Sequence, residues 1–144
     1  MKVTYRLLAA IIFGALLSAC SQKTEIKLVP LPQEVTVTGG SFTVDNSTSI
    51  TGNAEFEINY LKEKLSKGAS IQLKDGAEGK RVIEINVDPQ SAVGKEGYTL
   101  SVLPDKISIA ASDNGGAFYG VQTLLQLMPA EIYSEGTLGF NRKN

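Results

Sequence analysis

The sequence predicts an α+β domain, in which a mostly antiparallel or mixed β-sheet carries two helices packed on one face. Several short segments alternate apolar and polar residues, as half-buried strands do. Two longer segments repeat apolar residues at helical spacing, so each predicts an amphipathic helix. The elements follow in the order β-β-(β)-α-β-β-β-β-α, and both helices would bury their apolar stripes by covering one side of the sheet.

Composition and charge exclude several classes of protein. Hydrophobic residues make up 42% of the 144 residues and charged residues 20%, which is typical of a globular domain. The net charge of -1 gives no reason to expect a nucleic-acid partner. The chain has no His, no Trp and a single Cys, so it lacks the commonest general base, the commonest zinc ligand and any thiolate cluster. We therefore expect no catalytic, cofactor-binding or metal site in this chain.

Residues 1–19 are predicted to be the signal peptide of a bacterial lipoprotein. An apolar run over residues 7–17 follows the basic Lys2 and Arg6. Its length suits a signal-peptide core of roughly 7–15 residues rather than a membrane-spanning helix of ~20 residues. The next residues, Leu17-Ser18-Ala19-Cys20, resemble the lipobox, whose Cys is lipidated and becomes the mature N-terminus.

The lipobox resemblance implies lipidation of Cys20, a membrane anchor through the acyl chains, and a tether over residues 20–27. Because Ser21 rather than an Asp follows the Cys, the expected localisation is the bacterial outer membrane, on either face. The alternative interpretation is that Cys20 is one more small apolar residue that closes a secretory signal.

Residues 35–44 predict a β-hairpin, with strands at 35–38 and 41–44 around Gly39-Gly40. A Gly-Gly pair accepts the positive φ angles that tight hairpin turns require. In this register four apolar side chains share one face and are expected to point into the core. They are Val35, Val37, Phe42 and Val44.

The first helix is predicted over residues 53–67, and Gly68 is expected to end it. Its apolar stripe consists of Ala54, Ile58, Leu61 and Leu65, widened by Phe56 and Tyr60. Glu55 and Glu57 lie near its N-terminus, where negative charge complements the helix dipole. These carboxylates could form an acid–base pair, but side chains two residues apart diverge on a helix. A solvated, dipole-compensating face is the better interpretation.

Four further strands are predicted after this helix: 70–73, 81–87, 97–103 and 106–111. The last two form a second hairpin around Pro104-Asp105. Its apolar side chains are expected to face the core together, which requires an even-length loop of two or four residues. Those expected in the core are Leu100, Val102, Ile107 and Ile109.

The second helix is predicted to begin at residue 113 or 114, capped by Ser112 or Asp113, and to run to Met128 before Pro129. Its apolar stripe is Ala117, Val121, Leu124, Leu125 and Met128. Gly116 and Gly120 expose bare backbone on one face, and an interior glycine costs roughly 1 kcal/mol of helix stability. Close packing against a sheet or a neighbouring domain would explain that cost. We expect these two glycines to be candidates for domain docking, with a partly exposed apolar or Gly-lined surface left open around Gly120.

Two weaker motifs have ordinary interpretations. Residues 113–116 could begin an anion-binding helix, but a helix cap explains the same residues. Tyr60, Tyr98 and Tyr119 could stack on sugars, but each falls within a periodic apolar face and is expected in the core.

Three blocks of sequence stand out near the two ends of the predicted domain. The first is VPLPQEV at 29–35, the second GYTLSV at 97–102 followed by ISIAA at 107–111, and the third GAFYGVQTLLQL at 116–127. Together they resemble the opening and the close of the N-terminal domain of bacterial β-N-acetylhexosaminidases, glycoside hydrolase family 20. The resemblance assigns residues 28–129 to that α+β domain.

The resemblance implies a (β/α)8 barrel after the domain, with residues 130–144 as a truncated linker toward it. Such enzymes remove terminal N-acetylhexosamine. The substrate's 2-acetamido oxygen attacks the anomeric carbon, an Asp orients that group, and an adjacent Glu protonates the leaving oxygen. This sequence has no adjacent Asp-Glu pair and is too short for eight βα units, which need ~200 residues or more.

The expected function is therefore that of a non-catalytic N-terminal fragment of an exported β-N-acetylhexosaminidase, inactive alone, whose partner is the barrel. The alternative is a stand-alone membrane-anchored lipoprotein that binds or interacts through the same fold.

Overall fold

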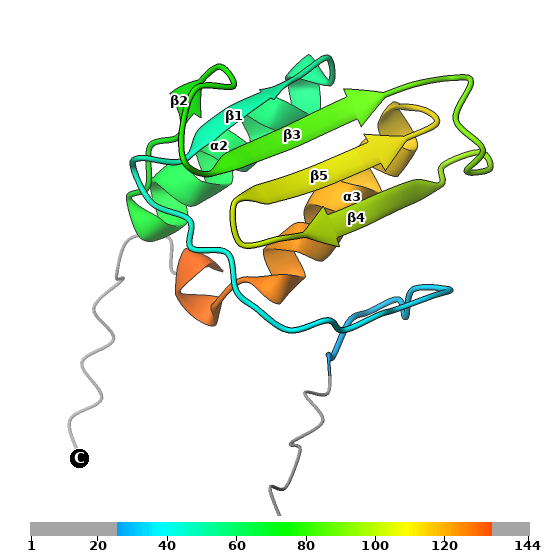
Figure 1. The fold of residues 1–144 in the computed structure, drawn as a ribbon, viewed down its shortest axis with the longest axis horizontal. Coiled ribbons are helices and arrows are strands. Elements are labelled where there is room, and N and C mark those ends of the chain that lie inside the picture. The colour runs from blue at the N-terminus through cyan, green and yellow to red at the C-terminus, as the bar shows by residue number, and fades with distance from the viewer. Residues whose placement is uncertain (1–25, 134–144) are drawn as a thin grey trace, which may run out of the picture.

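The computed structural model describes residues 26–133, which form a five-stranded mixed sheet (Figure 1). The strands are β1 (Ser49–Gly52), β2 (Lys74–Asp75), β3 (Val82–Val87), β4 (Tyr98–Val102) and β5 (Lys106–Ala111). They lie in the order β2-β1-β3-β5-β4. β1 is parallel to β2 and β3, and β3 is parallel to β5, whereas β4 and β5 are antiparallel.

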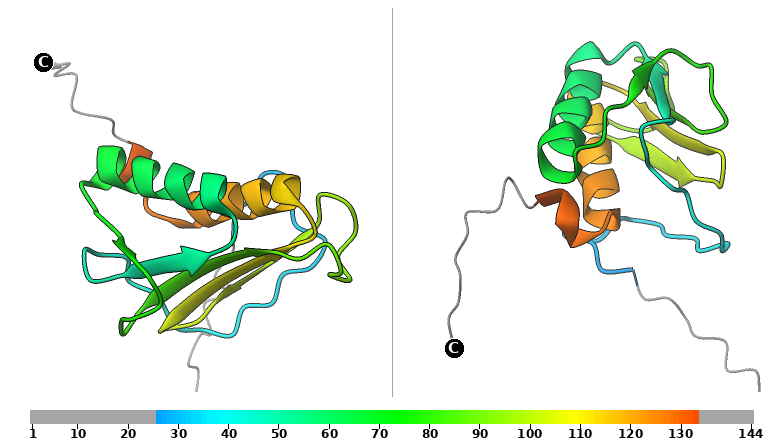
Figure 2. Two further views of the ribbon diagram at one scale, coloured as in Figure 1. Left: turned by 90° about the horizontal axis from the view of Figure 1, so that it is seen from above. Right: turned by 90° about the vertical axis from the view of Figure 1, so that its left-hand side faces the viewer.

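Two helices cover one face of this sheet, α2 (Glu55–Ala69) and α3 (Asn114–Leu127), and a 3-10 turn, η2 (Ala130–Tyr133), follows them. Figure 2 shows both helices on the same side of the strands. The predicted fold class, a mixed sheet with two helices on one face, is confirmed. No helix in residues 26–133 has the length and apolarity that crossing a bilayer requires.

The core lies between the sheet and the two helices. Strand side chains alternate between faces, and those on the helix side are buried isoleucines: Ile50, Ile83, Ile85, Ile107 and Ile109. The helices bury leucine, valine and alanine against them: Leu61 and Leu65 from α2, with Ala117, Val121, Leu124 and Leu125 from α3. The opposite face of the central strands carries polar side chains, including Thr51, Glu84 and Ser108.

The β4–β5 hairpin has the predicted register. Leu100 pairs with Ile109 and Val102 with Ile107, so all four side chains share the helix-facing side. The main-chain N–H of Leu103 donates to the carbonyl of Lys106 at 2.8 Å, which closes a turn with two central residues. The expected even-length loop is confirmed. Val102 is nevertheless 40% exposed, because it lies at the end of β4, which is the edge strand of the sheet.

The first predicted hairpin is wrong. Residues 35–44 form no strand, Val35 and Val37 are exposed, and Phe42 and Val44 are only half-buried against the core. Gly39 and Gly40 do have positive φ angles, 87° and 96°, so the local conformation at the glycines was predicted correctly. An isolated two-stranded hairpin is marginal in water. The apolar side of the sheet is already covered by α2 and α3, so no second surface buries both halves of this segment.

The end of α2 also differs from the prediction. The helix continues through Gly68 to Ala69 and ends at Ser70, which adopts the left-handed conformation with φ 56°. A Cβ atom on Gly68 would lie 1.6 Å from the carbonyl oxygen of Ile132, so this glycine lets η2 pack directly on the helix. Residues 70–73 are not a strand, and the short β2 follows at Lys74.

The segment that precedes the sheet is attached to α3 by one side chain. The main-chain N–H of Val29 donates to Gln126 Oε1 at 2.9 Å, and Gln126 Nε2 donates to the Val29 carbonyl at 3.0 Å. The amide of Gln126 thus pairs with the backbone as a neighbouring strand would.

Candidate functional site

The first turn of α3 is closed by Asp113, as one of the two predicted caps. Its Oδ1 accepts from the N–H of Gly116 at 2.8 Å, and its Oδ2 accepts from the N–H of Glu96 at 2.9 Å. These backbone hydrogen bonds, from Glu96 first, lower the pKa of the Asp113 carboxyl below its ordinary value. The carboxylate occupies the position that an external anion would take, so capping explains residues 113–116.

Gly116 and Gly120 face the domain's own sheet, and the expectation that they line an open docking surface is not met. Both are buried. A Cβ atom on Gly116 would lie 2.2 Å from the carbonyl oxygen of Gly97, and one on Gly120 would lie 2.6 Å from Ile109 Cγ2. The packing reason that these glycines require is therefore the close approach of α3 to β4 and β5.

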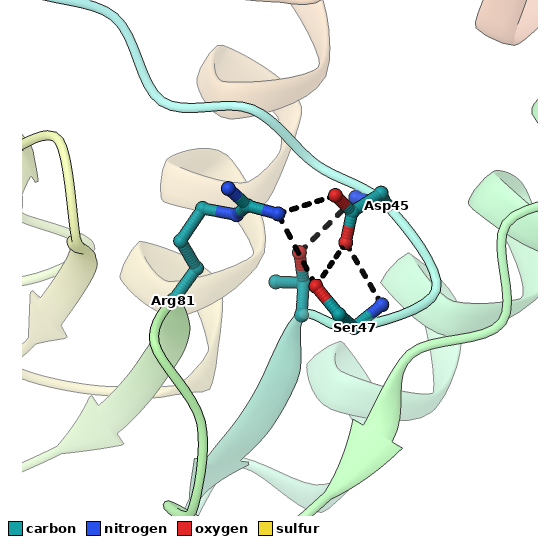
Figure 3. Close-up of polar contacts among 4 residues, drawn as sticks. Asp45, Ser47 and Arg81 are labelled. Atoms are coloured by element: carbon teal, nitrogen blue, oxygen red, sulfur yellow. Dashed lines mark hydrogen bonds and ion pairs between the residues drawn. The ribbon is translucent and has the colours of Figure 1, made fainter.

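A polar cluster ties the turn before β1 to the start of β3 (Figure 3). Arg81 pairs with Asp45 and also donates to Ser47 Oγ at 3.2 Å. The N–H and hydroxyl of Ser47 both donate to Asp45 Oδ1, at 2.8 and 2.5 Å. The main-chain N–H of Asp45 donates to Thr48 Oγ1 at 3.1 Å. The two Ser47 hydrogen bonds, with the Arg81 charge, lower the pKa of Asp45.

A second ion pair lies on the polar face of the sheet. Lys106 Nζ lies 2.6 Å from Glu84 Oε2, and Asn86 Nδ2 donates to Glu84 Oε1 at 3.0 Å. The hydrogen bond from Lys106 is the main cause of a lowered pKa for Glu84. Both oxygens of this carboxylate are thus engaged with neighbours on the sheet, and it has the character of a surface ion pair rather than a poised acid or base.

The two carboxylates of the first turn of α2 differ in environment. Glu55 is exposed, as expected, but Glu57 is 2% exposed, so the solvated face predicted for it is wrong. Its Oε2 is buried without a hydrogen-bond partner among the described residues. Glu57 follows Ala54 by three positions and precedes Leu61 by four, so it lies within the apolar stripe. That spacing was the signal that would have placed it there.

The outer side of the helix layer carries a row of four aromatic side chains, Phe56, Tyr60, Phe118 and Tyr119, here called the outer aromatic row. Ring centroids are 6.5 Å apart from Phe56 to Tyr60, 5.4 Å from Tyr60 to Phe118, and 6.3 Å from Phe118 to Tyr119. Phe56 is 64% exposed and Tyr119 is 49% exposed. The expectation that Tyr119 lies in the core and that Phe56 extends the buried stripe is wrong, whereas Tyr60 and Tyr98 are half-buried against the core.

Within residues 26–133 no three His, Cys, Asp or Glu side chains come together as metal ligands would. A shallow depression beside α2 is lined by Lys62, Glu63, Ser66, Gln72 and Leu73. Glu63 there is hydrogen-bonded to Lys67 at 2.5 Å, which lowers the Glu63 pKa. Cys20, the predicted lipidation site, lies outside the described residues.

Fold and side chains together define a small α+β domain, and its polar clusters cap a helix or join neighbouring strands and turns. Residues 25–139 match the model of glycosyl hydrolase family 20, domain 2, and the chain belongs to that family. It corresponds to the non-catalytic domain of a family 20 enzyme.

Relatives of the chain are much longer than the chain itself. It is 39% identical over 135 residues to the beta-hexosaminidase of Porphyromonas gingivalis, a match that covers 82% of this chain and 17% of the relative. It resembles the GH20 beta-N-acetylhexosaminidase of Streptomyces coelicolor, with TM-score 0.60 and 27% identity, over 68% of this chain and 21% of that one. It also resembles a Vibrio harveyi GH20 exo beta-N-acetylglucosaminidase complexed with N-acetylglucosamine, with TM-score 0.60 and 26% identity, over 69% and 16% of the two chains. The chain spans about a sixth to a fifth of these proteins.

Proposed function

We propose that the chain acts as the N-terminal domain of an exported β-N-acetylhexosaminidase that removes terminal N-acetylhexosamine from glycans. The observation that carries this proposal is the family match over residues 25–139, which spans all the described structure. The relatives named beta-hexosaminidase and beta-N-acetylhexosaminidase support the substrate class.

In this proposal the chemistry belongs to the catalytic barrel. Substrate-assisted retaining hydrolysis needs a carboxylate that orients the 2-acetamido group and a carboxylic acid that protonates the leaving oxygen. The lowered pKa values of Asp45, Glu84 and Asp113 make these groups poor acids at neutral pH, because each is held in its ionised form by hydrogen bonds. The domain contributes structure to the enzyme, and the barrel contributes the acid.

The test compares the chain alone with a barrel-bearing chimera. In the chimera, residues 25–139 replace the matching segment of the P. gingivalis beta-hexosaminidase. The chimera should hydrolyse an aryl N-acetyl-β-glucosaminide, and the chain alone should show no turnover above a mock purification from the same host. Turnover by the chain alone, or a folded chimera without activity, would contradict the proposal.

We also propose that Cys20 is lipidated and anchors the protein to the bacterial outer membrane. The sequence Leu17-Ser18-Ala19-Cys20 supports this step, and several acyl chains on one residue would anchor firmly where a single chain holds only marginally. Labelling with a palmitate analogue should mark the wild type, and Cys20→Ala should lose the label and leave the membrane fraction. Persistent labelling of Cys20→Ala would exclude this site.

A further inference from the structure

We propose that an exposed apolar segment, residues 29–37, here called the N-terminal arm, lies on the surface of the bilayer that holds the lipid anchor. This inference rests on the proposed lipidation of Cys20 and does not depend on the hydrolytic activity. The partner of the arm is a phospholipid surface rather than a second copy of the chain or another domain.

The arm exposes apolar side chains that the rest of the domain does not cover. Among the large apolar residues of the described chain, Val29 and Leu31 have the largest exposed fractions, 80% and 77%. Val35 and Val37 follow on the same segment and are also exposed. Aliphatic side chains gathered in this way form a patch, and exposed apolar patches mark interaction sites more often than scattered apolar residues do.

The base of the arm is fixed to the domain. Leu28 is buried, and the amide of Gln126 holds the backbone of Val29 through two hydrogen bonds. Pro30 and Pro32 restrict the backbone that follows. In Figure 1 the arm (blue to cyan) lies outside the sheet and the helix layer, on the side of β4. The arm therefore presents its apolar side chains at a defined position on the surface of the domain.

The position of the arm in the sequence places it close to the anchor. Val29 follows Cys20 by nine positions, so the chain between them spans at most roughly 30 Å when fully extended. A tether of this length gives the arm a high effective concentration at the bilayer, and contacts too weak to bind a membrane alone then become populated. The lipidated Cys20 and the arm would thus contact the bilayer as two linked sites.

The charge and the residue types of the arm suit a lipid surface. Residues 28–44 contain one charged residue, Glu34, and the connection from Cys20 to the arm carries two lysines and one glutamate, a balance that favours contact with anionic lipid headgroups. The arm has no aromatic residue and no arginine, the types that dominate the binding energy of protein–protein interfaces. Its Val, Leu and Pro side chains offer aliphatic surface, which gains from transfer into the acyl region of a bilayer.

The experiment measures thiol accessibility at one position of the arm and at a matched control. Because lipidation blocks the sulfur of Cys20, Leu31→Cys and Phe56→Cys each carry a single free thiol in the lipidated protein. Phe56 is the control because it is also a large exposed apolar residue, at 64%, and lies in the first turn of α2. Each lipidated variant is inserted into preformed phosphatidylcholine–phosphatidylglycerol vesicles and treated with a charged maleimide. The same variants in a Cys20→Ser background, which stay soluble, give the reference rates.

We expect the labelling rate at position 31 to fall about tenfold or more in the lipidated protein, because a thiol among acyl chains rarely ionises and only the thiolate reacts. The rate at position 56 should be the same in the lipidated and the soluble protein. A fall at both positions would mean that the bilayer hinders the reagent everywhere, which would overturn a specific contact of the arm.

A second measurement tests the arm without natural lipidation. One hexadecyl chain is attached through a maleimide to Cys20, the single Cys of residues 20–144, because one acyl chain alone binds membranes only marginally. Leu31→Ser in this conjugate should weaken binding to the same vesicles about fivefold, whereas Leu31→Met should bind as the wild type does. Phe56→Ser is the control and should not change the binding. The stability of the soluble chain in urea should be nearly unchanged by Leu31→Ser, since that side chain is exposed.

The outcomes separate the arm from its premises. Equal labelling rates at position 31 in the lipidated and the soluble protein would overturn the membrane contact and leave the lipid on Cys20 intact. A Cys20 that carries no lipid in cells would overturn the anchor and the inference together. Protection of position 31 without vesicles, in the chimera or in the isolated chain at rising concentration, would show that the barrel or a second copy covers the arm and would overturn the choice of a lipid surface. The hydrolytic activity of the chimera bears on the proposed enzyme function alone.

Discussion

The β4–β5 hairpin and the segment 35–44 both alternate apolar and polar side chains, but they differ in what lies behind the apolar ones. Behind Ile107 and Ile109 lie the core and α3, and both side chains are at most 2% exposed. Val35 and Val37 are 49% and 56% exposed, and the segment has no strand neighbour in the described part of the chain.

The comparison shows that alternating apolar and polar residues form a strand only where neighbouring strands and helices can bury the apolar side chains. β5 is central, with β3 on one side and β4 on the other, so its apolar residues are buried from several directions. Residues 35–44 have the same pattern and a turn-competent Gly39-Gly40, yet a hairpin alone does not bury enough surface to persist. Four predictions test how far the two regions differ in energy.

The largest effect is expected at Ile109. Ile109→Ala removes a side chain that is 1% exposed, and the cavity should reduce the free energy of unfolding by about 2–5 kcal/mol, measured by urea denaturation. The matched change Val37→Ala in the other region should stay within about 0.5 kcal/mol, because that side chain is half in solvent. Equal losses would mean that both regions belong to one core.

The variant Gly116→Ala tests how closely α3 packs against the backbone at the beginning of β4. Gly116→Ala places a methyl group 2.2 Å from the Gly97 carbonyl, which is backbone and cannot move aside as a side chain could. We expect a loss of about 1–3 kcal/mol in thermal or urea unfolding, despite the better helix propensity of Ala. Gly115→Ala should cost less, because its nearest neighbours are side-chain atoms of Asp113 and Glu96. A stabilised Gly116→Ala would contradict the close packing.

The stability loss expected for Phe42→Ala lies between those expected for Ile109→Ala and Val37→Ala. Its ring packs against the core but is only half-buried, so Phe42→Ala should cost about 1–2 kcal/mol rather than the 3–5 kcal/mol of a fully buried ring. A loss above ~3 kcal/mol would show that the segment 35–44 is bound as firmly as β5, and a loss below ~0.5 kcal/mol would show that it is detached.

The smallest effect concerns pH. The folded-state pKa of Asp45 is lowered from its ordinary 3.8, so its stabilising contribution is present above that value and is lost as the pH falls through the lowered pKa. Asp45→Asn should therefore flatten the loss of stability between neutral pH and pH values below 3.8. NMR titration of the carboxyl carbon should show the lowered pKa directly, and Ser47→Ala should move it upward. A pKa of Asp45 at or above 3.8 in the wild type would contradict its hydrogen bonds with Ser47 and its ion pair with Arg81.

Local patterns were sufficient to predict part of this fold. The β4–β5 hairpin, its even-length turn and a cap for α3 at Ser112 or Asp113 depend on residues that are close in sequence, so periodicity and turn chemistry predicted them. The strand order β2-β1-β3-β5-β4 depends on parallel pairing between segments that are distant in sequence, which no local pattern encodes.

Side-chain burial on the helices was predicted less well. Glu57 was assigned to solvent from its charge, although its spacing to Ala54 and Leu61 places it on the buried side of α2. Gly116 and Gly120 were expected at an open face because their cost in helix stability needs a packing partner, and the sequence could not say whether that partner was the sheet or another domain. The polar cluster around Arg81 was missed, since its members are 36 residues apart and meet only after β1 and β3 pair.

The amide of Gln126 has a consequence for how the domain can be carried in a longer polypeptide. It joins Val29 to the last turn of α3 across 97 residues of sequence, so the start of the described chain lies beside its last long helix. Domains whose ends are adjacent tolerate circular permutation and transfer into other proteins. A permuted chain would have to keep η2, because Ile132 belongs to the core and packs on Gly68. Joining residue 29 to the chain after η2 through a Gly-Ser linker, with new termini in the 88–97 loop, is the rearrangement that keeps both contacts.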